Sequence, residues 1–380
     1  MMLLQSRRRL AFAMSLASCC VLFSAPTKIM ASPVAEPDIP STTTIAPEPR
    51  NVDQQIKLAG DYLAGRGTAQ NLKLAAYWYE KAAGAGDPQA ELQIGYFYEA
   101  GIGVAKDPAR AAHWYQLAAS GGLIRAKVNL AVAYLWGTGV PTNKKLALKL
   151  LNEAAADGSG LAACYLGDFY AFGIGVPVDQ AAAERWYRKG AGLHDPLAEF
   201  DLGTLLSFGP NHTHDLSAAA SFFRESAASG YVPAMHSLGL LLIRNPALAR
   251  SPGEATDLLN HAANAGNWRS SMLLGVLARD GNGVPKDSKA AYYHFRVACL
   301  QGGDEAKKLL ATDLQLLSAK LGSFQAQTVE SEAEQWFTKH HFVLAFVDRE
   351  GETLDGFPVL ALADPGNGEH AAQLLTSPDN

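Results

Sequence analysis

Cysteine is scarce in this chain, and its scarcity excludes a fold held together by a disulfide framework. Only four cysteines occur among 380 residues, and two of them, Cys19 and Cys20, are adjacent near the N-terminus. The other two, Cys164 and Cys299, fall at apolar positions of expected helices. Unpaired cysteines at such positions behave as small hydrophobic side chains, so we interpret both as parts of the packing.

An excess of basic residues is missing as well. The chain has 32 Lys and Arg against 37 Asp and Glu, a net charge of −5 and a pI near 6.1. Nucleic-acid binding calls for a basic face, so we do not expect it. Hydrophobic residues make up 48% and charged residues 18%, which is a globular composition rather than a disordered one.

No arrangement of nucleophile, base and acid stands out in the sequence, and we therefore expect no enzyme, no cofactor and no metal. The best metal candidate is a group of four histidines. Neighbouring loops could bring these together, but a surface loop that happens to carry histidines is the commoner explanation. The group comprises His194, His212, His214 and His236.

The sequence also lacks an apolar run long enough to span a membrane comfortably near its start. Leu10–Ala25 is apolar and follows Arg7, Arg8 and Arg9, and it is short for a transmembrane helix. A basic segment before a short apolar one is typical of an export signal. The three arginines fit either general secretion or the twin-arginine route.

The end of this signal has two interpretations. Ordinary cleavage near Ala31 would give a signal of residues 1–31. Leu16–Cys19 is similar to a lipobox, and lipidation at Cys19 would shorten the signal to residues 1–18. We expect the periplasm or cell envelope in either case, with an outer-membrane lipoprotein as the lipidated alternative. Residues 32–54 carry many prolines among Ser, Thr and Glu, and we interpret them as an extended tether.

A repeat with a period of 36 residues dominates the rest of the chain. The position before each expected loop shows the period directly. It reads Gly65, Gly101, Gly137, Gly173, Gly209, Asn245 and Gly281. Repetition at a fixed period of this size predicts a solenoid of stacked units.

The second unit predicts that each repeat is a pair of helices. Apolar and small residues recur at helical spacing from Ala90 to Tyr98, and Gly101 follows where a helix would end. Asp107 and Pro108 then form a typical helix start. The loop glycines are no phosphate-binding loop, because they follow a helix rather than a strand.

The same roles recur at the same offsets in the other units. Expected N-caps are Asn71, Asp107, Asn143, Asp179, Asp215, Ser251 and Asp287. Small residues for close helix packing are Ala59, Gly95, Ala131, Gly167, Gly203, Gly239 and Gly275. Tyr62, Tyr98, Tyr134 and Tyr170 occupy one packing position, so they are not a cofactor site.

The motif A-x-x-x-[LI]-G-x-x-Y-x-x-G-x-G-V-x-x-D, followed by A-x-x-W-Y-x-x-A-A-x-x-G, resembles the Sel1-like repeat family, a relative of tetratricopeptide repeats. The resemblance implies an all-α fold, a right-handed α/α superhelix of seven helix pairs over residues 55–306. It also implies a module that binds protein or peptide partners, often an adaptor. The loops of the fifth and sixth units depart from the motif.

Two other functions follow from relatives in this family. Some lipidated relatives are scaffolds for polysaccharide export or envelope assembly. Others have been associated with β-lactam hydrolysis, but they carry a disulfide in each repeat, which this chain lacks. We therefore do not expect a hydrolase of the β-lactamase type.

The C-terminal part predicts a cap and a tail. Apolar spacing predicts capping helices within residues 307–341, the second of them beginning at Thr328. Residues 342–380 form an irregular tail, in which Phe342–Val347 and Phe357–Leu362 could be two strands or lie along the cap. We expect no order in about the last fifteen residues.

The candidate partner-binding site is the stripe of first-helix positions that the repeat's packing leaves free. In superhelices of this kind the first helices line the concave face. Trp136, Phe172 and Phe208 stand in register there and would anchor a peptide; alternatively, they seal contacts between units. The candidate residues are Tyr96, Asn129, Trp136, Tyr165, Asp168, Phe172, Asp201 and Phe208.

Overall fold

The computed structural model describes residues 49, 51–208 and 215–339 and three short strands at 343–347, 359–363 and 374–375. These residues belong to two compact units, each made of several repeats, and the boundary between them lies between Leu193 and His194 in the sequence. From here on, the first unit and the second unit are these two parts of the chain and not single repeats. The expected export signal, Cys19, His212 and His214 lie outside the described residues. The expected tether ends earlier than predicted, because the first helix begins at Val52.

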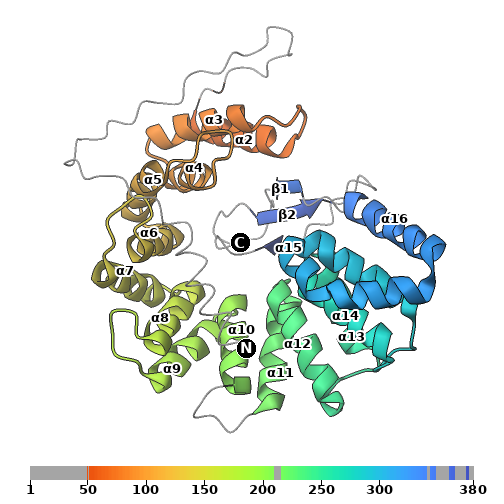
Figure 1. Ribbon diagram of the computed structural model, residues 1–380. Coiled ribbons are helices and arrows are strands. Elements are labelled where there is room, and N and C mark those ends of the chain that lie inside the picture. Colours follow the sequence, from red (N-terminus) through yellow and green to blue (C-terminus); the bar gives the residue numbers. More distant parts are fainter. Residues whose placement is uncertain are drawn as a thin grey trace. The chain divides into compact units, whose positions relative to one another are not determined.

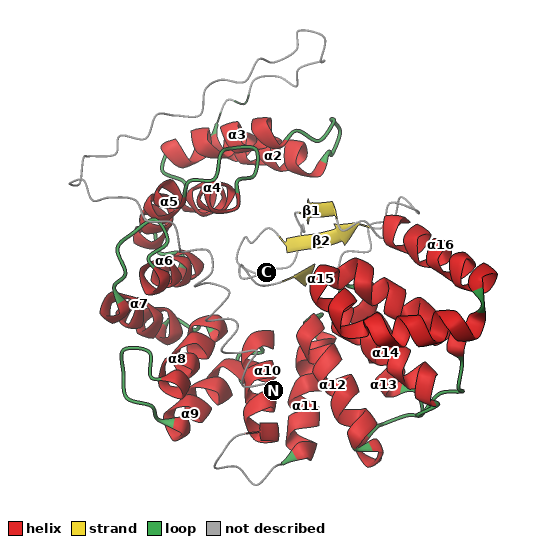
Figure 2. Ribbon diagram, viewed as in Figure 1, coloured by secondary structure: helices red, strands yellow, loops and turns green. Residues whose placement is uncertain are grey.

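The first unit consists of helices that follow one another in pairs (Figures 1 and 2). Each first helix packs against the second helix of its own pair and against the second helix of the pair before it. The pairs are α2 (Val52–Ala64) with α3 (Leu72–Gly84), α4 (Pro88–Ala100) with α5 (Pro108–Ser120), α6 (Ile124–Trp136) with α7 (Lys144–Ala156), and α8 (Gly160–Phe172) with α9 (Gln180–Ala191).

The second unit continues in the same manner (Figure 1). Its pairs are α10 (Pro196–Phe208) with α11 (Leu216–Ala228), α12 (Val232–Arg244) with α13 (Glu254–Asn264), and α14 (Trp268–Asp280) with α15 (Ser288–Leu321). A 3-10 turn, η1 (Pro246–Leu248), precedes α13, and α16 (Ser323–Lys339) follows α15. The predicted all-α fold of consecutive helix pairs is confirmed.

Local sequence determines where most helices begin. Six of the seven predicted N-cap side chains accept a hydrogen bond from a backbone N–H in the first turn of the second helix. Such a bond satisfies one of the donors that a helix start leaves unpaired. The prediction for Ser251 is wrong, because α13 begins at Glu254 with Gly253 as its N-cap.

The small residue of the first helix lets the two helices of a pair approach closely. A Cβ atom added at Gly95 would lie 2.7 Å from the ring of Tyr115. At Gly167 the added atom would lie 2.3 Å from the ring of Tyr187. Both tyrosine rings are buried, so the glycine and the aromatic ring form one packing unit, as the repeat pattern predicts.

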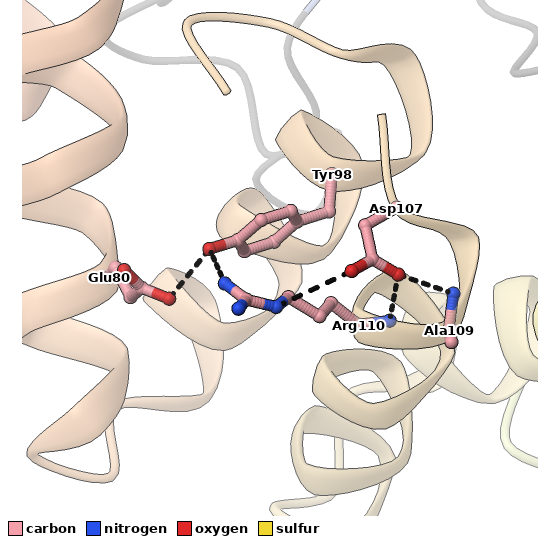
Figure 3. Close-up of polar contacts among 5 residues, drawn as sticks. All are labelled: Glu80, Tyr98, Asp107, Ala109 and Arg110. Atoms are coloured by element: carbon pink, nitrogen blue, oxygen red, sulfur yellow. Dashed lines mark hydrogen bonds and ion pairs between the residues drawn. The ribbon is translucent and has the colours of Figure 1, made fainter. Parts of the chain in front are cut away.

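A buried tyrosine links successive pairs through a polar chain (Figure 3). The hydroxyl of Tyr98, on α4, donates to Glu80 Oε1 of α3 over 2.8 Å. Arg110 Nη1, on α5, donates to the same hydroxyl over 2.8 Å. Asp107 caps α5 and lies 3.4 Å from Arg110 Nε. The Tyr98 ring is buried, which agrees with a packing role.

The end of the helical array differs in detail from the prediction. Helix α15 runs through the seventh pair into the expected cap, with a kink at Gly303, where φ is 58° and ψ is −139°. Helix α16 begins at Ser323 rather than at Thr328. Only Gly322 separates α15 from α16.

The tail of the second unit contains a three-stranded antiparallel sheet in the order β1-β2-β3. Val343–Val347 forms β1, Val359–Ala363 forms β2, and Val343 pairs with Ala363. Of the two alternatives for this segment, the strands are therefore present. Leu374–Leu375 forms β3, so the expectation of no order in the last residues is wrong at this point.

Candidate functional site

The free positions of the first helices form the candidate site, which we call the first-helix stripe. Its members include the last residue of each first helix. Trp136 ends α6 and Phe172 ends α8, and each is half-buried. The chain then turns away at Gly137 and Gly173, which both adopt left-handed φ values. This placement leaves part of each aromatic ring open to solvent.

Phe208 holds the equivalent position in the second unit. It ends α10, and 42% of its surface is exposed. Large aromatic side chains that remain partly open can anchor a partner at low cost in side-chain entropy. All three predicted aromatic anchors are therefore accessible to solvent. Trp136 and Phe172 belong to the first unit, and Phe208 belongs to the second.

Three other members of the stripe are not accessible. Tyr96, Asn129 and Tyr165 are buried, so the predicted exposed position is wrong for them. Asn129 lies on α6, and its side-chain Nδ2 atom is buried. Burial and the nearby Glu99 raise the pKa of Tyr96 to about 12. These three side chains are buried in the helical packing and are not available to contact a partner.

The two aspartates of the stripe are half-buried. Asp168 Oδ1 accepts a hydrogen bond of 2.7 Å from the hydroxyl of Tyr187, on the second helix of the same pair. One carboxylate of the predicted groove therefore already has a structural partner. Asp201, on α10, lies at the stripe position one turn before Thr204.

A buried acid that the sequence did not single out lies on α10. Glu199 is 2% exposed. Burial, followed by the charges of Glu225 and Asp195, raises its pKa to about 7. His194 Nδ1 lies 3.9 Å from Glu199 Oε1. The repeat does not mark this position consistently, because Glu91 of α4 and Lys127 of α6 both stand there.

The histidines described by the structure have separate roles. His236 Nδ1 lies 2.8 Å from Ser270 Oγ, and burial together with Arg269 lowers the pKa of His236 to about 4. The side chain of His194 is almost fully exposed. Within the described ranges no group of three potential metal ligands occurs, while His212 and His214 lie outside them.

Two further sequence interpretations concern cysteine and the membrane. Cys164 and Cys299 are buried and take part in no disulfide bond, as predicted. Among the helices that the structure describes, none combines the length and apolarity needed to cross a bilayer. Within the first unit the candidate surface offers Trp136 and Phe172 as accessible aromatic residues, and within the second unit it offers Phe208.

Comparison with known families identifies the helix pairs. The model of the Sel1 repeat matches residues 55–87, 88–123, 124–159, 160–195, 196–231 and 269–303, more than half of the chain. The chain belongs to the Sel1 repeat family. The match leaves out residues 232–268, which contain α12 and α13, so it supports six repeats rather than the predicted seven.

One solved structure agrees with this assignment, and two others show weaker similarity. A Sel1 repeat protein from Oxalobacter formigenes is 27% identical, with a TM-score of 0.56 over 65% of this chain and 98% of that one. A protective antigen of uropathogenic Escherichia coli is 22% identical, with a TM-score of 0.41 over 80% and 74%. The immunity protein Pa5087 from Pseudomonas aeruginosa is 18% identical, with a TM-score of 0.40 over 69% and 86%. No curated protein matches the chain.

Sel1 repeat proteins are in general scaffolds for protein–protein interaction and are not a catalytic family. This general property agrees with the site geometry, in which a helical surface offers aromatic anchors. The identity of the partner is a separate question.

Proposed function

We propose that this protein is an exported adaptor that binds a protein or peptide partner on the first-helix stripe. The observation that carries the proposal is the partial exposure of an aromatic residue at the last position of three first helices. These residues are Trp136, Phe172 and Phe208. A repeat that needed them only for packing would bury them, as it buries Tyr98 and Tyr115.

Binding of this kind needs a preformed surface and no covalent step. Helices anchored by caps and close packing hold the aromatic rings in place before a partner arrives, which limits the entropy lost on binding. The partly exposed rings supply apolar contact area, and the neighbouring aspartates supply orientation.

Replacing Trp136 and Phe172 with alanine tests the proposal. The full chain and the variant would be incubated with envelope extract, and the partner captured by the full chain would be identified and then titrated against both. We expect at least a tenfold loss of affinity in the double variant, with a thermal midpoint within a few degrees of the original. Unchanged affinity would exclude the stripe, and a collapsed midpoint would show that both rings belong to the core.

Leu117→Ala is a suitable control for this experiment. Leu117 is also partly exposed, but it lies on the second helix α5 rather than on a first helix. We expect this variant to bind the partner with unchanged affinity.

Export to the periplasm or cell envelope is part of the proposal, and the basic and apolar residues near the N-terminus support it. A lipidated scaffold for polysaccharide export or envelope assembly is the alternative. Incorporation of radiolabelled palmitate that is lost in Cys19→Ser would support the alternative. Export without any label would support ordinary cleavage.

A further inference from the structure

The exposed charges on the second helices of the first unit are nearly all positive. Among the Lys, Arg, Asp and Glu residues of α3, α5, α7 and α9, Glu153 is the one acid that is exposed. The exposed cations are Lys73, Lys81, Lys144, Lys145, Lys149, Arg185, Arg188 and Lys189. All but the first two lie on α7 and α9, and we call the cations of these two helices the basic face.

The cations of α7 and α9 form one surface, because the two helices are neighbours (Figure 1). Lys189 Nζ, on α9, donates to the carbonyl oxygen of Ala155 in the last turn of α7 over 2.8 Å. Arg185 stands one period of 36 residues after Lys149, and both are exposed. The two helices therefore present the same repeat position to solvent, with a positive charge on each.

The second helices of the second unit carry no such excess of positive charge. In α11, α13 and the part of α15 before Gly303, the exposed charged residues are Glu225, Asp257 and Lys289. Asp257 holds the repeat position that Lys149 and Arg185 hold in the first unit. The packing of the repeat therefore does not require a cation at this position, and the basic face needs another explanation.

The charges of the basic face are only partly compensated within the protein. Arg188 Nη2 lies 2.7 Å from Glu184 Oε1, and Lys149 Nζ lies 3.7 Å from Glu153 Oε1. No ion pair involves Lys144, Lys145 or Arg185 within the part of the chain that the structure describes. Lys145 and Lys149 stand four residues apart on one helix face, where like charges repel each other. An anion bound beside them would relieve this repulsion.

The same two lysines border an open hollow on α7. Its volume is about 470 Å³, and half-buried Leu146 and Leu148 contribute to its lining together with Asn143 and Asn152. Lysine side chains can lay their methylene stems along an apolar surface and keep the ammonium group in water. The hollow thus combines a cationic rim with an apolar floor.

A phospholipid headgroup fits this combination. Ammonium and guanidinium groups donate charge-assisted hydrogen bonds to phosphate oxygens, and the apolar floor would contact the glycerol and the first methylene groups. A bilayer presents many headgroups in one plane, which suits cations spread over two helices better than a single anion does. We propose that the basic face binds the headgroups of an anionic phospholipid bilayer. The proposal does not rest on the function proposed for the first-helix stripe, because the basic face lies on second helices.

Sedimentation of the full chain with lipid vesicles tests the proposal. Vesicles of phosphatidylcholine alone are compared with vesicles of phosphatidylcholine and phosphatidylglycerol in equal parts. We expect the chain to prefer the anionic vesicles, and Lys145→Glu/Lys149→Glu/Arg185→Glu to weaken this binding by at least about tenfold, because each basic residue near an anionic bilayer adds to the attraction. Equal binding to both kinds of vesicle, or unchanged binding by the triple variant, would overturn the proposal.

Lys286→Glu/Lys308→Glu/Lys320→Glu is the matched control. These lysines are also exposed but lie in the second unit, and their replacement changes the net charge by the same amount. The basic and apolar residues near the N-terminus are present in every variant, so their own binding is common to all. We expect the control to bind the anionic vesicles within about twofold of the original chain. A loss equal to that of the first variant would show that net charge alone matters and would overturn the proposal.

A neutral variant guards against a change in folding. Lys145→Gln/Lys149→Gln/Arg185→Gln removes the three charges without adding acids. We expect an intermediate loss of binding to the anionic vesicles and a thermal midpoint within a few degrees of the original. If this variant binds as the original chain does, the basic face is not the lipid-binding surface.

An acidic polymer is the alternative occupant of the basic face. Polyglutamate in solution is therefore added to the chain and the anionic vesicles, with carboxylate and lipid phosphate at matched concentrations. We expect the chain to remain on the vesicles, and to leave them when salt is added, because salt screens exposed charges. Transfer of the chain to polyglutamate would show that the basic face recognises an acidic polymer instead of a bilayer and would overturn the proposal.

Discussion

Successive helix pairs are joined by different means in the two units. In two loops of the first unit, the second glycine lies directly on the backbone of the preceding pair. A Cβ atom added at Gly103 would lie 2.0 Å from the carbonyl oxygen of Leu72, and one at Gly139 would lie 2.0 Å from that of Pro108. Contact of this kind is possible only without a side chain.

In the second unit, the pair of α12 and α13 lacks the glycine loop and uses an ion pair. Arg224 Nε, on α11, lies 2.7 Å from Glu254 Oε1 at the start of α13. Arg224 Nη2 also donates to the carbonyl oxygen of Leu248 over 2.6 Å. Gly283, in the next loop, has nothing within 4 Å of an added Cβ. The second unit therefore tolerates a loop sequence that the first unit would reject.

Gly139→Ala should have the largest effect of the substitutions that separate the two units. The new methyl group would overlap backbone atoms of Pro108 and Ala109, and those atoms cannot move away as a flexible side chain can. We expect a loss of about 3 kcal/mol or more in the stability of the first unit. Hydrogen exchange in α5 and α7 would measure it without assuming that the whole chain unfolds in one step.

Gly283→Ala is the control for this substitution. Its φ of 75° is close to the 73° of Gly139, so both variants share the cost of a side chain in a left-handed conformation, about 1 kcal/mol. Only Gly139→Ala adds the overlap. Equal losses in the two variants would show that close backbone contact does not distinguish the units.

One repeat position holds a charged residue in both units, but the charged groups beside that residue differ. In the first unit, Lys127 Nζ lies 2.6 Å from Asp157 Oδ2. In the second unit, the equivalent Glu199 is buried near Glu225 and Asp195, with the exposed His194 beside it. A pair of opposite charges is thus replaced by a group of acids.

Glu199→Gln should change how stability depends on pH. The folded-state pKa of about 7 lies above the ordinary value of 4.5. The folded state therefore binds more protons between these values, and its stability falls as pH rises through that window, by at most about 3 kcal/mol. We expect the glutamine variant to remove this slope and to be more stable than the original chain at pH 8.

Glu91→Gln tests whether this pH dependence of stability is specific to Glu199 or arises from any buried glutamate at the same position of the repeat. Glu91 is buried at the equivalent position of α4, and burial followed by the charge of Asp87 raises its pKa too. We expect a change in the same direction but smaller. Thermal unfolding between pH 4.5 and pH 8 would measure both, and an unchanged slope in Glu199→Gln would contradict the assignment.

The sequence predicted those parts of the fold that depend on short-range pattern. Caps, small packing residues and the helix-ending glycines recur at fixed offsets, and the structure confirms most of them. The N-cap prediction for Ser251 is wrong because the loop before α13 takes an extra turn at η1. A prediction from a fixed offset within the repeat cannot represent such a turn. Burial depends on the neighbouring pairs instead, so periodicity could not show that Tyr96, Asn129 and Tyr165 are packed while Phe208 is open.

The smallest expected effect concerns the turn where the two units meet in the sequence. Gly86, Gly122, Gly158, Gly230 and Gly266 hold the equivalent position in other pairs, all with positive φ. His194 is the exception, with a φ of 56°. A non-glycine residue in this conformation is strained, but glycine gives the unfolded chain more freedom, which offsets part of the relief.

We therefore expect His194→Gly to stabilise the second unit by less than about 1 kcal/mol. The measurement is made at pH 8. Gly158→His is the reverse experiment in the first unit, and nothing lies within 4 Å of a Cβ added there. It should destabilise by a similar amount through the backbone alone. If both substitutions destabilise, His194 makes a contact in the folded state that outweighs its strain.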